Sequence, residues 1–321
     1  MRRLLPVLLL LAACTTQPAL TPSPAPRETP SGLATSPSLA ESRRATRMAA
    51  LRSAIDSLVA TRPGAEAAIW FHDFARGDTL GINADASFHA ASTMKVPVMI
   101  ELFRRADAGT LSLDKTTLLV NRFRSIVDGS PYALSPSDDS DTLLYAKVGT
   151  MVSWRELNER MITLSSNLAT NYIIDTLGAK AVTATAHALG ATGMQVLRGV
   201  EDQKAYDRGL NNTTTARALG VLLDAIEHGR AASRVACDTM RAVLLRDAFR
   251  TEIPAGLPAG TPVAHKTGWI TGTLHDAAIV YPPGRSPYIL VVLTRKIPEE
   301  KDAQRLIASI SREVWRRTTT P

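Results

Sequence analysis

The two ends of this 321-residue chain carry the same pattern of elements, and that match constrains the fold more than any other feature of the sequence. Near the N-terminus, apolar residues recur at helical spacing from Arg43 until Pro63 ends the pattern, and a strand-like hairpin follows. Near the C-terminus, three strand-like segments precede a helix that opens at Pro298. The expected strands span residues 67–74, 79–82, 265–267, 277–281 and 288–294. We therefore predict a five-stranded antiparallel sheet flanked by an N-terminal and a C-terminal helix.

The middle of the chain carries helical signals instead. Ser153 and Glu156 form a capping box ahead of an apolar run, and Gly229 closes another amphipathic segment. We predict an α+β fold in which an all-helical part, residues 90–257, is inserted into an α/β part made of residues 43–89 and 258–318. The cleft between two such parts is a natural place for a small-molecule site.

The first 42 residues indicate export rather than folded structure. Residues 1–13 combine two arginines with an apolar stretch that is too short to cross a bilayer, a pattern typical of a signal peptide. The run Leu11-Ala12-Ala13-Cys14 resembles a bacterial lipobox, so we expect Cys14 to be lipidated; an ordinary cleaved signal with an incidental cysteine is the alternative. Residues 14–42, rich in Pro, Ser and Thr, should be a disordered linker to a domain at 43–321. We expect a membrane-anchored lipoprotein that faces the periplasm or the cell exterior.

The charge balance is basic but carries no binding pattern. A net charge of +7 and a pI of about 9.6 would suit a nucleic-acid partner, yet no run of five or more Lys/Arg occurs. The histidines fall in no zinc-binding spacing, and the acidic run 138–141 lacks the Gly and Glu of an EF-hand loop. We therefore expect no nucleic acid, no metal and no cofactor.

The sharpest chemical feature is Ser92-Thr93-Met94-Lys95 at the start of an apolar helical run. Residues three apart share a helix face, so the Ser92 hydroxyl and the Lys95 amine can meet. A desolvated lysine near other cations has a lowered pKa and can take the proton of a serine nucleophile. By itself the pattern is weak evidence, because it more often marks a capped helix start followed by an exposed lysine.

Two further motifs, in order along the chain, change that interpretation. Ser165-Ser166-Asn167 lies at a helical junction, and Lys266-Thr267-Gly268 lies on an expected strand. With these three motifs the chain resembles the class A serine β-lactamases and their penicillin-binding relatives, from about Arg43 to Arg317. One departure is Ser166, which stands where the family usually has Asp.

The resemblance implies the roles in acylation. Ser92 would attack the carbonyl, Lys95 would help to activate it, and Ser165 would relay a proton to the leaving nitrogen. The amides of Ser92 and Trp269 would form the oxyanion hole. The family's substrate-binding roles fall on Asn167, Lys266, Thr267 and Gly268. Of these, Asn167 would hydrogen-bond the substrate, Lys266 and Thr267 would receive its carboxylate, and Gly268 would let the backbone approach closely.

Hydrolysis also needs a carboxylate that positions the deacylating water, and Glu201 stands at the family's spacing from Ser165. The surrounding loop departs from the family, because Ala205 replaces an expected Asn and Asn212 replaces an expected Asp. One partner of the water and one loop salt bridge are therefore expected to be missing. The alternative is that Glu201 or its neighbour Asp202 is only a solvated loop acid.

These observations predict a monomeric serine β-lactamase that confers antibiotic resistance by hydrolysing a small-molecule β-lactam through an acyl-serine intermediate. The alternatives are a peptidoglycan D,D-peptidase, or a non-hydrolytic protein that binds or senses β-lactams with the same acylation site. The long stretch from Asn121 to Tyr145 precedes the Ser165 motif, and we expect it to border the cleft.

Overall fold

The computed structural model describes residues 39–319. The expected signal segment, Cys14 and residues 14–38 of the expected linker lie outside this range. Helix α1 spans Leu39–Ala60, so the last four residues of the expected linker are helical instead. Glu41 lies in the first turn, where a carboxylate interacts favourably with the positive end of the helix dipole.

One five-stranded antiparallel sheet joins the two ends of the chain, which confirms the prediction. Its strands are β1 (Glu66–Asp73), β2 (Asp78–Ile82), β9 (Val263–Ile270), β10 (Thr273–Val280) and β11 (Tyr288–Arg295). The order is β2-β1-β11-β10-β9, so the first strand pairs with the last, with Ile69 opposite Val292. Strand β9, which carries the Lys266 motif, lies at the edge of the sheet.

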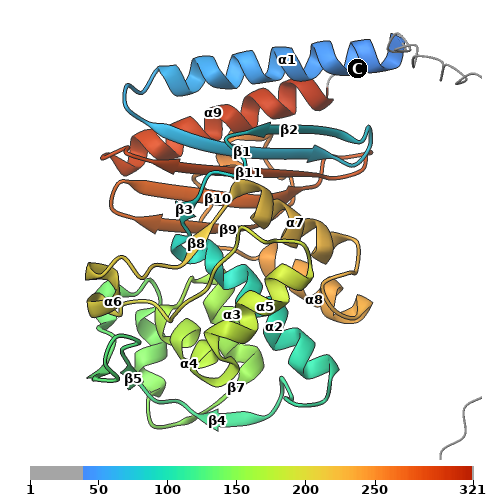
Figure 1. Cartoon of the computed structure of the whole chain (residues 1–321). Coiled ribbons are helices and arrows are strands. Elements are labelled where there is room, and N and C mark those ends of the chain that lie inside the picture. Colours follow the sequence, from blue (N-terminus) through green and yellow to red (C-terminus); the bar gives the residue numbers. More distant parts are fainter. Residues whose placement is uncertain (1–38, 320–321) are drawn as a thin grey trace, which may run out of the picture. The chain divides into compact units, whose positions relative to one another are not determined.

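The two faces of the sheet pack against different layers. Helix α1 and the C-terminal helix α9 (Glu300–Thr319) cover one face, and Leu51, Phe71 and Ile307 belong to the apolar core between them (Figure 1). The opposite face carries Val291 and packs against α7 (Ala216–Glu227) and the rest of the inserted part. Because side chains alternate along a strand, β1, β9, β10 and β11 contribute to both cores, whereas β2 contributes only to the core under α1 and α9.

The inserted part is mainly helical but not wholly so. Its other helices are α2 (Lys95–Asp107), α3 (Trp154–Thr163), α4 (Asn167–Leu177), α5 (Ala179–Ala188), α6 (Gln203–Asp207) and α8 (Arg234–Leu244). Three two-stranded ribbons correct the expected all-helical composition: β3 (Phe88–His89) with β8 (Thr213–Thr214), β4 (Thr116–Leu118) with β7 (Met151–Ser153), and β5 (Phe123–Arg124) with β6 (Pro131–Tyr132). The expected cap forms at α3, where Ser153 Oγ accepts a hydrogen bond from Glu156 N at 3.1 Å. No helix between residues 39 and 319 is both long and apolar enough to cross a membrane.

Candidate active site

Ser92 lies in a short 3₁₀ turn, Ala91–Met94, that leads directly into α2. The edge strand β9 passes so close to this turn that a Cβ on Gly268 would lie 2.8 Å from Ser92 N and 2.9 Å from Thr93 N. Only glycine fits at this approach without moving one of the two segments. The edge of β9 and the backbone amides of the nucleophile turn therefore face one another.

The Lys95 amine is fully buried, and its three hydrogen-bond contacts are all with the Ser165 motif. Nζ donates to Ser165 O at 2.6 Å, to Ser165 Oγ at 3.1 Å and to Asn167 Oδ1 at 2.9 Å. Among the described residues no hydrogen bond joins it to Ser92 Oγ, although the helical spacing predicted that the two would meet. Burial and the nearby Lys266 ammonium hold the pKa of Lys95 well below its ordinary value. A neutral amine at this point can accept a proton.

Asn167 connects the Lys95 amine to Glu201. Its Oδ1 accepts from Lys95, while its Nδ2 donates to Glu201 Oε1 at 3.3 Å. The Glu201 side chain is open to the cleft, yet burial of its surroundings and the Asp138 carboxylate raise its pKa above the ordinary value. Glu201 also adopts a left-handed φ of 60°. A left-handed backbone conformation is energetically costly for any residue other than glycine, and such residues cluster at functional sites.

The neighbouring acid Asp202 is structural. Its carboxylate is buried, caps α6, and accepts hydrogen bonds from Ser125 Oγ and Ile126 N, each at 2.9 Å. It therefore fastens the Glu201 loop to the β5–β6 ribbon. Of the two candidate loop acids, Glu201 is the one at the site.

Asn212 joins the two ends of the Glu201 loop through hydrogen bonds and not through a salt bridge. Its Oδ1 accepts from Leu197 N at 2.8 Å and Arg198 N at 3.2 Å, and its Nδ2 donates to Arg198 O at 3.0 Å. The Arg198 guanidinium donates to Leu210 O, Gly199 O and Asn211 Oδ1 instead of forming an ion pair with any described residue. The expected loss of the ionic contact is thus offset by uncharged hydrogen bonds.

Lys266 and Thr267 occupy opposite faces of β9. Lys266 lies on the face that packs against the inserted part, where its buried Nζ lies 3.5 Å from Asp247 Oδ2 and 5.8 Å from the centre of the Phe249 ring. The contact with Asp247 was not expected from the sequence, because no motif links two residues on separate elements. It anchors the ammonium at the back of the site.

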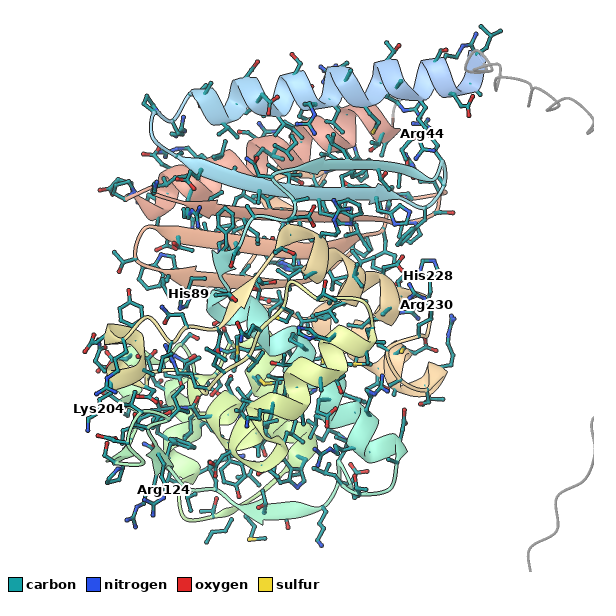
Figure 2. All side chains as sticks on the ribbon, viewed as in Figure 1. Arg44, His89, Arg124, Lys204, His228 and Arg230 are labelled. Carbon is teal, nitrogen blue, oxygen red and sulfur yellow. The ribbon has the colours of Figure 1, made fainter. Side chains whose placement is uncertain are left out.

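The site opens into two adjoining hollows of about 300 and 600 Å³ that share Ser92, Asn167, Glu201 and Trp269 as walls. The smaller is also lined by His89 and Tyr206, and the larger by Asp138, Asp139, Ser165, Thr267 and Glu252. Figure 2 shows His89 at the junction between the sheet and the inserted part, and Lys204 on α6 on the same side. Residues 138–140 come from the long stretch before the Ser165 motif, which borders the cleft as expected.

The sequence model of the β-lactamase enzyme family matches residues 50–318 of this chain. The chain belongs to the class A serine β-lactamase family. β-Lactamase AST-1 of Nocardia asteroides is 30% identical over 248 residues, which cover 76% of this chain and 75% of the relative. An ancestral class A β-lactamase has a TM-score of 0.71 at 27% identity, covering 83% of this chain and 99% of that structure.

A neighbour with a different name matches this chain with the same TM-score as that β-lactamase. PBP-A has a TM-score of 0.71 at 29% identity, covering 83% of this chain and 95% of that structure. A mutant of PBP-A, also 29% identical with a TM-score of 0.71, was solved as an acyl-enzyme complex with penicillin-G.

Proposed function

We propose that this protein is a serine β-lactamase that opens the β-lactam amide through an acyl intermediate on Ser92. The observation that carries the proposal is the hydrogen-bonded series from the Lys95 amine through Asn167 to Glu201, beside the nucleophile turn. This arrangement puts a group suited to acylation and a group suited to deacylation on the two ends of one amide side chain.

In acylation, Ser92 Oγ bonds to the lactam carbonyl carbon and its proton passes to the Lys95 amine. Substrate binding would bring the two groups into contact, since catalytic hydrogen bonds often tighten only in the complex. The amides of Ser92 and Trp269 stabilise the oxyanion. The C–N bond then breaks as Ser165 Oγ gives its proton to the ring nitrogen, and Lys95 restores that proton through their 3.1 Å hydrogen bond.

In deacylation, Glu201 takes a proton from the water as the water oxygen bonds to the acyl carbon. The bond from that carbon to Ser92 Oγ then breaks, and the proton held by Glu201 returns to Ser92 Oγ. We expect Glu201→Gln to slow deacylation at least about 100-fold while acylation changes little, because only the water-activating carboxylate is lost. Rapid-quench intact-mass measurement with a penicillin separates the two rates. Asp207→Asn, which changes an exposed acid at the end of the neighbouring helix α6, is the matched control. Unchanged turnover in Glu201→Gln would remove the assigned role.

A D,D-peptidase is the second candidate, and the Glu201 loop favours it. Among the described residues the Glu201 carboxylate has one hydrogen-bond donor, Asn167, and Ala205 offers no side-chain amide to hold a water. A persistent penicillin adduct on wild-type protein would indicate the peptidase or a non-hydrolytic sensor, whereas a transient adduct with ring-opened product supports the lactamase. Ser92→Ala should form no adduct, and labelling elsewhere would contradict the choice of nucleophile.

We further propose that the protein is exported as a monomeric lipoprotein anchored through Cys14, facing the periplasm or the cell exterior. The apolar stretch that ends in Leu11-Ala12-Ala13-Cys14 supports this proposal. Cys14→Ala should move the protein from the membrane pellet to the soluble fraction. Retention of that variant in the pellet would overturn lipid anchoring.

A further inference from the structure

A carboxylate from the long stretch before the Ser165 motif reaches the start of α4. Asp139 Oδ2 accepts hydrogen bonds from Asn167 N and Leu168 N, both at 2.9 Å, and from Tyr145 OH at 3.0 Å. The Asp139 side chain is only 7% exposed. Backbone amides of a first helical turn lack partners within the helix, so an anionic acceptor there is stabilising.

The cap residue of α4, Ser166, does not bind the amides of Asn167 and Leu168, which Asp139 binds instead. Ser166 Oγ accepts only from Ala169 N, at 3.3 Å, among the described residues. Its hydroxyl is neutral and reaches one of the three amides, while the carboxylate of Asp139 takes the other two. The motif that carries Asn167 is therefore completed by a residue 28 positions earlier in the chain.

We propose that Asp139 is a positioning residue that supplies the carboxylate which the motif lacks at Ser166, and that it thereby fixes Asn167 between Lys95 and Glu201. The proposal rests on the function proposed above. Because the backbone of Asn167 is held by Asp139, the amide side chain can keep both of its contacts, at 2.9 Å to Lys95 and 3.3 Å to Glu201. Loss of the carboxylate frees the residue that joins the two catalytic groups.

The negative charge of Asp139 raises the pKa of both Lys95 and Glu201. Against the lowering effect of burial, it raises the pKa of the Lys95 amine, and as a like charge it contributes to the raised pKa of Glu201. The other charged groups around these two side chains are Lys266, Asp138, Arg198 and Asp247. Removing the charge of Asp139 therefore lowers the pKa of Lys95 and of Glu201 together.

The test is Asp139→Asn, alone and combined with Ser166→Asp. The single variant should acylate with penicillin about 10- to 100-fold more slowly, since Asn167 loses its fixed position. In a plot of acylation rate against pH, the acid limb is the fall in rate at low pH. This acid limb should move to lower pH, whichever of Lys95 and Glu201 causes it. Ser166→Asp restores a carboxylate at a position where Asp is a favoured cap, so the double variant should regain rate and move the limb back.

The matched control is Asp141→Asn, which removes another buried carboxylate from the same segment. Asp141 binds Arg160 Nη1 at 2.9 and 3.0 Å and sends no side-chain contact to α4. It should lower the melting temperature without moving the acid limb. The proposal would be overturned if Asp139→Asn acylated at the wild-type rate with an unmoved acid limb. It would also be overturned if the double variant acylated no faster than the single one.

A readout without substrate separates this proposal from the proposed function. The ¹³Cε resonance of Lys95, assigned with Lys95→Arg, should titrate at lower pH in Asp139→Asn and return toward the wild-type midpoint with Ser166→Asp. If wild-type protein forms no penicillin adduct, the proposed function fails, and this titration still decides the placement of Asp139. An unmoved midpoint would refute it.

Discussion

Gly268→Ala tests whether the approach of β9 to the nucleophile turn controls acylation. The new Cβ would lie 2.8 Å from Ser92 N and 2.9 Å from Thr93 N, about half an ångström inside ordinary contact. Both neighbours are backbone atoms, so the strand or the turn has to move by roughly that distance. Because a displacement of about 1 Å can cost about 100-fold in rate, we expect acylation to slow about tenfold, or about 1.4 kcal/mol in the barrier.

The measurement is the rate of penicillin adduct formation by intact mass, normalised to folded protein. Gly220→Ala is the control, because its Cβ would meet the Trp70 ring at 2.1 Å in a part of α7 that lines neither hollow. It should reduce stability while the remaining folded molecules acylate at the wild-type rate. Folded Gly268→Ala that acylates as fast as wild type would refute the reasoning.

Three further predictions concern the surroundings of the site. Burial raises the pKa of Glu252 to about 7 from 4.5, so its stabilising contribution is present below pH 4.5 and is lost as pH rises through 7. Wild-type protein should therefore lose about 3 kcal/mol of unfolding free energy between pH 4.5 and pH 8 through this group, and Glu252→Gln should not show that loss in urea unfolding at the two pH values. Burial lowers the pKa of His275 to about 4 from 6.5, so its contribution is present above pH 6.5 and is lost as pH falls through 4; the unfolding free energy of His275→Asn should be flatter over that range. Asn212→Ala leaves the amides of Leu197 and Arg198 without their acceptor, and should cost about 1–3 kcal/mol of unfolding free energy and slow deacylation more than acylation.

The sequence predicted the parts of this molecule that depend on local pattern. Helical spacing after Arg43 and the alternating strands near both ends were enough to predict the sheet, and three ordered motifs were enough to find the residues that the structure brings together around Ser92. The short ribbons were missed, because strands of two or three residues carry no measurable periodicity.

The missed site residues share one physical cause. Asp139 and Asp247 meet the Ser165 and Lys266 motifs from segments 28 and 19 residues away, and both contacts exist only after separate elements have packed. An acid in a loop has the same sequence signature whether it is solvated or buried against a helix start. The opposite fates of Glu201 and Asp202 illustrate this, since one is open to the cleft and the other caps α6.

The pairing of the first strand with the last also affects the order of folding. Strand β1 has only β2 and β11 as neighbours, so its register with β11, from Glu66 opposite Arg295 to Asp73 opposite Tyr288, cannot form until nearly the whole chain has been synthesised. Such distant contacts make folding slow, because the closing of a long loop precedes the gain from its contacts. Until then β1 has only β2 beside it, and the apolar side chains of β1 and α1 lack β11 and the C-terminal helix to cover them. The strand that links the two ends of the chain is therefore among the last parts of the sheet to find its full set of neighbours.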